Sequence, residues 1–378
     1  MVEFPLIEVE EGAAHLVVPD LERIAPGAYP TKAPVFYNPD MVHNRDISLL
    51  VYRQFLGGKG SILDMLAATG VRSVRAALEA GATRVLACDA KPAAVELIRA
   101  NIERNGVSDI VEAVQGDARA VVLRREWFDI IDVDPFGCPT PFLQGVSAAI
   151  RPRRGLIGVS ATDGAVLCGV HPKVCMRKYG SRSLKTPYCH ELAMRILVYA
   201  SALPLLRDDY GVRPVLSHAS IHFFRVYLET RKGKARADLT MDQIGYVAHC
   251  MHCGWRGTGK RPRELCPCCQ KPTAWAGPLW TGPLNDQELV SSLAGQEKLA
   301  PDAQKLLEKL AAEPDIPLFY DLHALGKDLV MDVPRTSRVM DALREQGYIA
   351  GPTHLSGSGV KTDAEVDAVK DAMRAAAV

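Results

Sequence analysis

Short apolar segments that end in an acidic residue alternate with segments of helical periodicity through the first 230 residues of the chain. This pattern predicts strands and helices in alternation, followed by two strands that form a hairpin. Such alternation is typical of a mostly parallel sheet covered by helices on both faces. We therefore expect a doubly wound α/β fold. The expected strands are 61–64, 84–89, 110–115, 128–133 and 156–160, the expected helices are 72–80, 93–104 and 190–206, and the hairpin strands are 214–218 and 223–229.

The composition changes after residue 240. From Ile244 to Pro283 the chain is rich in cysteine, glycine and proline, and from Asn285 onward the pattern is mostly helical. The segment 334–346 is expected to be a helix, and the glycine-containing tail 348–362 suits a hairpin wing. We therefore expect two domains, 1–240 and 241–378, the second a smaller α+β domain with a zinc-ribbon-like insertion at 246–275.

Composition excludes several classes of protein. With 24% charged and 48% hydrophobic residues the chain is not disordered, and its net charge of +1 provides no overall attraction to nucleic acid. The first residues lack the pattern of a signal peptide, and the longest apolar stretch, Ala193–Leu206, is too short to span a bilayer. Ten cysteines in such a chain suggest thiols or metal ligands. We expect a soluble, cytoplasmic protein with no membrane partner and no obligate protein partner.

Four acidic residues stand at or just after the ends of four successive expected strands, at positions 64, 89, 117 and 134. Ligands of doubly wound sheets bind beyond the carboxyl ends of the strands. Aspartate also caps helices and populates turns, and that structural reading accounts for any one of these residues. It accounts poorly for all four together, because the turns differ in type.

The turn 67–72 predicts a nucleotide-type site. Gly70 lets a ligand approach the backbone, but the three-glycine fingerprint that holds a pyrophosphate is absent. Asp89 follows Gly70 by 19 residues, which is about the spacing of an acid that binds ribose hydroxyls. The site therefore suits S-adenosylmethionine, with its ribose on Asp89, its adenine amine on Asp117 and its methionine over residues 64–70, including Asp64. The alternative is a turn with a purely structural role.

The tetrapeptide Asp134-Pro135-Phe136-Gly137 ends the fourth expected strand. It resembles the [Asn/Asp]-Pro-Pro-aromatic element of methyltransferases that act on exocyclic amino groups. An aryl amine is a poor nucleophile, and a carboxylate that accepts its N–H favours sp³ character and can take the proton. Phe136 offers a flat face for a base; the alternative is a strand-ending turn with a core phenylalanine. Cys138 is interpreted as a buried thiol, since no basic neighbour is apparent to activate it.

Two residues near the N-terminus are further candidates. Phe36 is a candidate second face for a base opposite Phe136, and Arg45 a candidate partner for a carboxylate such as the methionine tail of the cofactor. Aromatic clusters more often fill cores.

The cysteine pairs 250/253 and 266/269 have the Cys-x2-Cys spacing of metal knuckles. Four thiolates leave no open position, so a structural zinc ion is expected, with rubredoxin-type iron as the alternative. Cys268 is a less favoured substitute for Cys269, and His249 and His252 are interpreted as spectators. The expected ligands are Cys250, Cys253, Cys266 and Cys269.

Between Asp163 and Glu191 the chain has basic residues and no acidic one. A charge run is usually a solvated face, but this one follows the fifth expected strand, on the same rim as Asp134. Basic side chains there would bind the phosphates of a nucleic acid. The candidates are Lys173, Arg177, Lys178, Arg182 and Lys185, and the cysteine-rich segment adds Arg256, Lys260, Arg261, Arg263 and Lys271.

Over nearly its whole length the chain is similar to the tRNA (guanine-26-N2)-dimethyltransferase family in its archaeal form. The resemblance rests on many short motifs, and the Gly70 turn alone would not carry it. The motifs are Phe36–Pro39 with Asn44–Asp46, Ala68–Arg72, Asp132–Gly137, Ala161–Gly164, Leu167–Gly169, Arg177–Tyr179, Cys189–Glu191 and Ile316–Asp321.

The resemblance implies a Rossmann-like class I methyltransferase domain and a C-terminal domain that helps to hold tRNA. It implies S-adenosylmethionine as the donor and two successive methyl transfers to N2 of guanine 26. Asp134 matches the catalytic aspartate of the family, and Phe36 and Phe136 match the aromatic pair that sandwiches guanine. The zinc knuckles vary within the family. The residues that match the cofactor contacts are Arg45, Arg72, Asp89, Asp117 and Ala118.

Other functions stay open at this point. One is an amino-methyltransferase that acts on another RNA guanine or on DNA adenine. Another is a non-catalytic RNA-binding module on a methyltransferase fold, against which the intact Asp134 and Asp89 argue. A dehydrogenase is disfavoured by the missing glycines.

Overall fold

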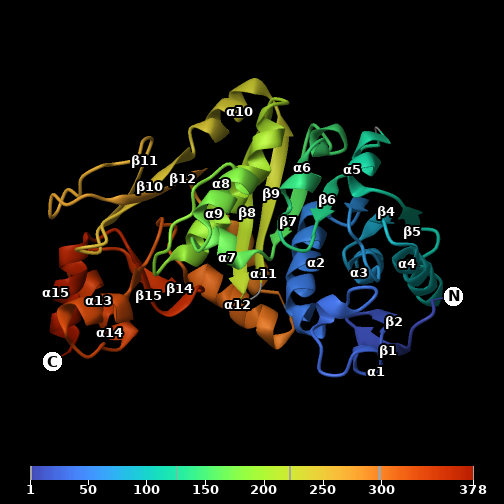
Figure 1. The fold of residues 1–378 in the computed structure, drawn as a ribbon, viewed down its shortest axis with the longest axis horizontal. Coiled ribbons are helices and arrows are strands. Elements are labelled where there is room, and N and C mark those ends of the chain that lie inside the picture. Colours follow the sequence, from blue (N-terminus) through green and yellow to red (C-terminus); the bar gives the residue numbers. More distant parts are fainter. Residues whose placement is uncertain (1, 125, 221–222, 297–298, 378) are drawn as a thin grey trace.

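A twisted seven-stranded sheet organises the larger part of the molecule (Figure 1). The computed structural model describes residues 2–124, 126–220, 223–296 and 299–377. All strands are parallel except β9, which pairs antiparallel with both of its neighbours. From one edge to the other the order is β5 (Val111–Gln115), β4 (Ala82–Asp89), β3 (Gly60–Asp64), β6 (Ile130–Val133), β7 (Gly155–Ala161), β9 (Phe223–Lys232) and β8 (Tyr210–Ser220).

The chain reverses its direction of travel across the sheet between β3 and β6. It runs outward from β3 to β4 and β5, and then returns to the other side of β3. The side chains that follow β3 and β6 therefore flank the switch point, where open α/β sheets bind their ligands. This topology places the ends of the strands that carry Asp64 and Asp134 next to each other.

Helices cover both faces of the sheet, which confirms the doubly wound α/β prediction (Figure 1). In β3 the adjacent residues Ile62 and Leu63 belong to different hydrophobic clusters, because successive side chains of a strand point to opposite faces. The cluster of Ile62 includes residues of α2 (Val42–Leu56), α3 (Val71–Glu79) and α4 (Pro92–Arg104). The cluster of Leu63 includes α9 (Cys189–Leu206), with α5 (Ala118–Val121), α7 (Gly164–Leu167) and α8 (Pro172–Tyr179).

Two N-terminal elements complete this part of the molecule. The hairpin of β1 (Leu6–Glu11) and β2 (Ala14–Pro19) packs on α3 and α4. The buried Asn101 side chain accepts from Val17 N at 2.7 Å and donates to Thr69 O at 2.9 Å, so it ties the hairpin to the turn after β3. The helix α2 follows the short 3₁₀ turn Pro39–Met41 and ends at Gly57, which has left-handed backbone angles.

The C-terminal part contains two small sheets and five helices among the described residues. The sheet of β11 (Arg256–Gly259), β10 (Ile244–His249) and β12 (Ala274–Trp280) packs on α9 through β12. The second sheet, β13 (Tyr320–Asp321), β15 (Ser356–Thr362) and β14 (Ala350–Thr353), contains the expected wing. The helices are α11 (Gln287–Ala294), α12 (Pro301–Ala312), α13 (Leu322–Leu329), α14 (Thr336–Glu345) and α15 (Val366–Ala376).

Packing joins the two predicted domains. Helix α12 contacts α2, and residues of α11 and α12 share the hydrophobic cluster of Ile62. A buried ion network adds to the junction: Lys361 on β15 lies 3.4 Å from Glu191 of α9 and 2.9 Å from Glu313. Burial opposes ionisation of Glu191, but the charges of Lys361 and Arg195 hold its pKa below the ordinary value. The boundary at residue 240 stays a prediction.

Helix α9 is the single helix, within the described ranges, that is long and apolar enough to cross a membrane. Its 18 residues are 78% buried inside the molecule, against β8, β9 and β12. Core helices pass the same length and composition test, so we assign α9 to the hydrophobic core. The cytoplasmic location stays a prediction.

Candidate active site

A cavity of about 290 Å³ opens at the switch point of the sheet. Its walls are the turn after β3, the ends of β4 and β6, and the N-terminal segment around Phe36. A larger cavity, of about 790 Å³, lies elsewhere, between β8, α10 (Lys234–Met241) and residues 280–288. The smaller cavity holds most of the predicted site residues, and we take it as the candidate active site.

The turn after β3 needs glycine at position 70 for two reasons. Gly70 has φ +77°, and a Cβ at this position would lie 3.2 Å from the Ile98 side chain. Ala68, just before it, also has positive φ, +50°, and its N–H donates to Asp89 Oδ2 at 3.0 Å. The N–H of Lys91 donates to the other oxygen, Oδ1, at 2.9 Å. Two backbone donors therefore fix the Asp89 carboxylate beside the turn, and Asp89 and Ala68 both line the cavity.

Asp64, at the end of β3, is only 3% exposed and lines the same cavity. One carboxylate oxygen accepts from Ser73 Oγ at 2.7 Å. Burial, with the nearby charge of Asp132, raises the pKa of Asp64 to about 7. This carboxyl therefore titrates near neutral pH.

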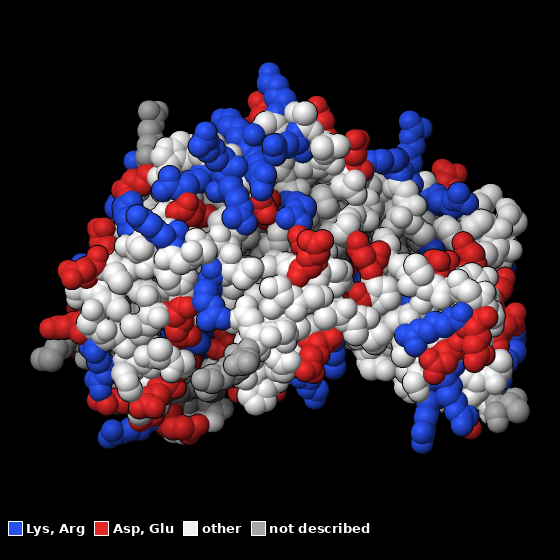
Figure 2. All heavy atoms as spheres, turned by 180° about the vertical axis from the view of Figure 1, so that it is seen from behind, with Lys and Arg blue, Asp and Glu red and all other residues white. Residues whose placement is uncertain are grey.

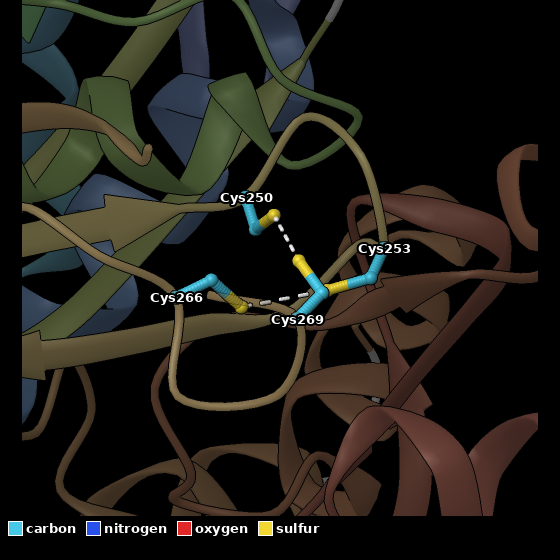
Figure 3. A group of neighbouring side chains, drawn as sticks. All are labelled: Cys250, Cys253, Cys266 and Cys269. Atoms are coloured by element: carbon cyan, nitrogen blue, oxygen red, sulfur yellow. Dashed lines mark hydrogen bonds between the residues drawn. The ribbon is translucent and has the colours of Figure 1, made fainter. Parts of the chain in front are cut away.

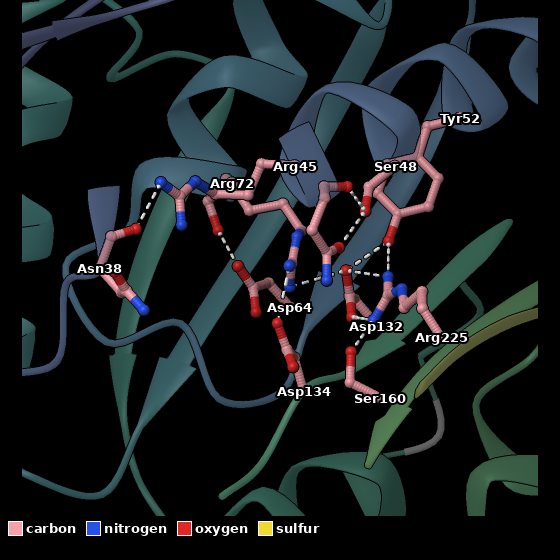
Figure 4. Close-up of polar contacts among 12 residues, drawn as sticks. Asn38, Arg45, Ser48, Tyr52, Asp64, Arg72, Asp132, Asp134, Ser160 and Arg225 are labelled. Atoms are coloured by element: carbon pink, nitrogen blue, oxygen red, sulfur yellow. Dashed lines mark hydrogen bonds and ion pairs between the residues drawn. The ribbon is translucent and has the colours of Figure 1, made fainter. Parts of the chain in front are cut away.

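Asp134, which follows β6, lines the same cavity and forms an ion pair with Arg72, the second residue of α3 (Figure 4). The Asp134 Oδ2 to Arg72 Nη2 distance is 2.6 Å, and Arg72 Nη1 is 3.2 Å from Asp132 Oδ2. Burial opposes ionisation of Asp134, but Arg72 and Arg225 hold its pKa below the ordinary value. Asp134 is therefore an ionised hydrogen-bond acceptor at neutral pH.

A buried network beside Asp134 holds Arg72 in place (Figure 4). Asp132, fully buried, accepts from both terminal nitrogens of Arg225, each at 3.0 Å, and from the hydroxyl of Tyr52. Arg225 Nη1 also donates to Ser160 Oγ at 2.9 Å. Sequence reasoning missed Tyr52 and Arg225 as members of the site. Asp132 was detectable, because residues two apart on a strand share a face and Asp132 is two residues before Asp134.

The two candidate base-binding rings meet at the cavity: Phe36 comes before the 3₁₀ turn Pro39–Met41, and Phe136 comes after the end of β6. The Phe36 and Phe136 ring centroids are 4.7 Å apart with an interplanar angle of 84°, an edge-to-face contact. Phe136 is 58% exposed, which argues against a core role. Cys138, farther along, is partly buried, and its sulfur is 3.1 Å from Thr140 Oγ1.

Arg45 lines the cavity, but acidic and backbone groups already bind it. Its Nε and Nη2 donate to the two oxygens of Glu11, each at 2.6 Å, and Nη2 also donates to Asn38 O at 3.1 Å. Glu11 also accepts from Arg75 Nη1 at 2.8 Å. The predicted contact of Arg45 with a cofactor carboxylate would therefore compete with a buried ion pair.

Asp117 and Ala118 are not among the residues that line the cavity. Asp117 caps α5: its Oδ1 accepts from Arg119 N at 2.9 Å, and the Arg119 side chain lowers its pKa to about 2. Asp117 nevertheless stays near the rim, because Gly116 N donates to Asp89 O at 3.0 Å. The structure thus brings together Phe36, Arg45, Asp64, Arg72, Asp89, Asp134 and Phe136, with Gly70 in the adjoining turn.

The four predicted metal ligands converge in the C-terminal part (Figure 3). The Sγ atoms of Cys250 and Cys269 are 3.5 Å apart, as are those of Cys253 and Cys266. Sulfurs of a tetrahedral zinc site are about 3.8 Å apart, given Zn–S bonds of about 2.3 Å. The donor set and its spacing therefore fit a closed structural zinc or iron site. Cys268 and His252 are exposed and His249 is buried, and all three lie outside the group.

The predicted basic rim lies on α8 and the turn that follows. Lys173, Arg177 and Lys178 are exposed, and Lys178 O accepts from Thr140 Oγ1 at 2.9 Å, close to the end of β6. Lys185 is exposed, whereas Arg182 stacks on Trp275 with 4.7 Å to the ring centroid. Arg182 is thus partly used in packing the cysteine-rich sheet.

Figure 2 shows a second gathering of basic side chains, on the face of the molecule that is turned away from the viewer in Figure 1. Two cavities at the amino ends of the parallel strands are lined by Arg154, Arg213, Arg231 and Arg236. Residue 230 pairs with Gly155, the first residue of β7, so this cluster lies at the amino ends of the parallel strands, away from Asp134. Glu229 pairs with Arg154, Arg213 and Arg231 and offsets much of the charge.

Comparison with known proteins gives a consistent result. The sequence profile of the "N2,N2-dimethylguanosine tRNA methyltransferase" family matches residues 12–374. A tRNA (guanine(26)-N(2))-dimethyltransferase of Methanosphaera stadtmanae is 38% identical over 96% of this chain and 95% of that protein. The corresponding enzyme of Haloarcula marismortui is 38% identical over 97% of this chain and 99% of that protein.

A solved structure agrees with these relatives. It is Trm1 from Pyrococcus horikoshii in complex with S-adenosyl-L-methionine. It superposes with a TM-score of 0.87 at 36% identity and covers 97% of this chain and 100% of that chain. The match spans both the sheet with its cavity and the C-terminal part. The chain therefore belongs to the N2,N2-dimethylguanosine tRNA methyltransferase family.

Proposed function

We propose that this protein transfers methyl groups from S-adenosylmethionine to N2 of guanine 26 in tRNA, first to the monomethyl and then to the dimethyl product. The observation that carries the proposal is the pairing of two carboxylates on one cavity: Asp89, held by backbone donors, and Asp134, held ionised by Arg72. The Asp89 carboxylate is placed to bind ribose hydroxyls, and the Asp134 carboxylate is suited to accept a hydrogen bond from an amino group. Family membership supports both assignments.

The donor is proposed to bind along the turn after β3. Asp89 accepts hydrogen bonds from the ribose hydroxyls, and the turn around Gly70 lies against the methionine part. Asp64 and Arg72 line the cavity here. Arg45 assists if it exchanges Glu11 for the donor carboxylate, and Asp117 and Ala118 form the outer edge on the adenine side. The bound donor supplies an electrophilic methyl on a sulfonium, whose positive charge is lost as the methyl leaves.

Guanine 26 is proposed to leave the tRNA stack and enter the cavity from the side of Phe136. Enzymes that modify a base inside a helix extrude it at a cost of a few kcal/mol. Stacking on an aromatic ring returns about 1–3 kcal/mol per base. Phe36 and Phe136 now touch edge to face, so a sandwich requires one ring to rotate and the pair to separate. The exposed Phe136 has room to do so.

Asp134 is proposed to accept a hydrogen bond from the N2 amino group. The nitrogen lone pair forms the bond to the methyl carbon while the sulfur–carbon bond breaks, and the amino proton passes to Asp134 or to water. Arg72 and the Asp132–Arg225 pair fix the carboxylate, so little reorganisation accompanies the reaction.

The basic side chains Lys173, Arg177, Lys178 and Lys185 are proposed to bind tRNA phosphates near the cavity, with a smaller part for the stacked Arg182. The Cys250, Cys253, Cys266 and Cys269 group is proposed to hold zinc, which would stabilise the ribbon that packs on α9. Four thiolates complete the coordination, so this ion takes no part in the chemistry.

Methylation of an unmodified tRNA transcript tests this proposal. The wild-type protein should place one and then two methyl groups on guanine 26, as shown by digestion and nucleoside mapping. A transcript with adenine at position 26 is the matched control and should stay unlabelled. Methyl groups on another guanine or on DNA adenine would identify a different amino-methyltransferase. Absence of transfer to any tRNA would indicate a non-catalytic RNA-binding protein.

A further inference from the structure

A second group of metal-type donors lies outside the four-cysteine site. Cys168, Cys189 and His190 each contribute one donor atom, and these three atoms all lie within 4.8 Å of one another. Cys168 caps the end of α7, and the other two residues are the first two of α9. Twenty residues separate the two contributions along the chain, so the fold itself brings the donors together.

Close backbone packing holds the two segments against each other. Gly169, next to Cys168, has φ +90°, and a Cβ there would lie 2.3 Å from the Leu184 carbonyl carbon. Any side chain at position 169 would therefore push the segments apart. In addition, the buried Ser183 hydroxyl donates to Val166 O at 2.7 Å. The approach of Cys168 to Cys189 thus depends on a tight backbone contact and a buried hydrogen bond.

The chemistry of the donors suits zinc. Two thiolates and one imidazole, with a water as fourth ligand, form a recurrent tetrahedral zinc environment. Both cysteines are partly buried, which shields the thiolates, while His190 is exposed at the surface. The His190 ring also packs on Phe224, with 5.9 Å between centroids and a 35° tilt, which restricts its orientation. If the three donor atoms moved slightly closer together, the distances between them would reach the roughly 3.8 Å that tetrahedral zinc requires.

We propose that Cys168, Cys189 and His190 bind a second zinc ion whose fourth ligand is water. As the two Zn–S bonds form, the two thiols release their protons to solvent, and no electron is transferred.

The ion would join the segment after β7 to the start of α9 beside the active site. Thr162, in the turn after β7, accepts from Gly137 N at 2.7 Å and donates to Gly137 O at 3.0 Å. The metal would thus brace the loop that carries Asp134.

Metal content separates this site from the four-cysteine site. Protein loaded with zinc, challenged with a moderate chelator and desalted should hold two zinc ions per chain by mass spectrometry of the metal. Cys189→Ser and Cys253→Ser should each lower the content to one. Cys138→Ser, a partly buried thiol outside both groups, is the matched control and should keep two. One zinc in the wild type, unchanged in Cys189→Ser, would overturn the proposal.

A second measurement covers the case in which Cys189→Ser does not fold. His190→Gln keeps both thiols and should weaken binding at this site at least about tenfold in a chelator titration, while the other ion stays bound. Cobalt(II) should likewise give tetrahedral absorption that saturates at two equivalents in the wild type. A Cys168–Cys189 disulfide in peptide maps, together with a single metal per chain, would contradict the proposal. These readouts are independent of methyl transfer, so their failure is distinguishable from failure of the proposed function.

Discussion

Replacing Asp134 with asparagine removes a negative charge from the cavity and leaves the shape of the side chain unchanged. In the wild type, Asp134 Oδ2 is 2.6 Å from Arg72 Nη2. Arg72 keeps a second partner in the variant, because Asp132 lies 3.2 Å from Nη1 and is itself held by Arg225. The variant should therefore fold, with the Arg72 guanidinium close to its present position.

The expected effect of Asp134→Asn is on the methyl-transfer step. The amino nitrogen gains positive charge as it attacks, so an ionised acceptor binds it more strongly in the transition state than in the ground state. Removing one preorganised electrostatic partner of this kind costs about 10²–10³ in rate, or about 3–4 kcal/mol. Binding of the donor does not use this carboxylate in the proposed arrangement, so its Kd should change by less than about threefold.

Single-turnover methylation of a tRNA transcript measures the rate of methyl transfer, and calorimetric titration with S-adenosylmethionine measures the Kd of the donor. Asp163→Asn is a useful control: Asp163 lies near the same rim and accepts from the Tyr179 hydroxyl, but it is not among the residues that line the cavity. A rate for Asp134→Asn within about tenfold of the wild type would refute the electrostatic role. A loss of donor affinity as large as the loss of rate would reassign Asp134 to cofactor binding.

Three further substitutions test other parts of the account. Asp89→Asn should weaken donor binding by about 2 kcal/mol, roughly thirtyfold in Kd by calorimetry, and an unchanged Kd would exclude the ribose contact. Burial raises the folded-state pKa of Asp64 from 3.8 to about 7, so the folded protein binds a proton that the unfolded chain releases above about pH 4. The free energy of unfolding of the wild type therefore falls as the pH rises from about 4 to about 7. Asp64→Asn should therefore gain stability over the wild type across that range, by up to about 4 kcal/mol in denaturant titrations, and equal pH profiles would contradict the raised pKa. Cys253→Ser should release its metal and lower the melting temperature, with transfer at low temperature largely retained; a wild type free of zinc and iron would end the metal assignment.

Much of the sheet was predictable because its strands are short, apolar and bounded by acids or turns. The expected strand 84–89 is β4, 82–89, and the expected helix 93–104 is α4, 92–104. In a parallel sheet the carboxyl ends share one edge, so acids at these ends are expected near one cavity. Asp64, Asp89 and Asp134 meet that expectation.

The elements that escaped prediction contain polar residues at buried positions. Helix α2 has no simple apolar stripe, because Asn44, Arg45 and Ser48 are buried in it. Their partners are distant in sequence: Arg45 binds Glu11, and Ser48 shares a hydrogen bond with Tyr227. Periodicity depends on apolar residues marking the buried face and cannot detect such pairs.

The same limit applies to the support under Asp134. Arg225 would be read from its strand as an exposed charge, yet it is fully buried because Asp132, 93 residues away, neutralises it. Asp117 shows a related limit: its place after a strand predicts a ligand contact, which stays a prediction, and the pattern does not reveal that the side chain of Arg119 also binds its carboxylate. Local sequence identifies the residue types of a site, whereas their partners depend on tertiary contacts.

A structure of the protein with S-adenosylhomocysteine and an unmodified tRNA would show where guanine 26 lies. We expect its N2 within about 3 Å of an Asp134 carboxylate oxygen, with the ring between Phe36 and Phe136 and the ribose of the bound nucleoside on Asp89. A guanine 26 that stays stacked in the tRNA, or an Asp134 carboxylate turned away from both N2 and the sulfur, would contradict the proposed chemistry.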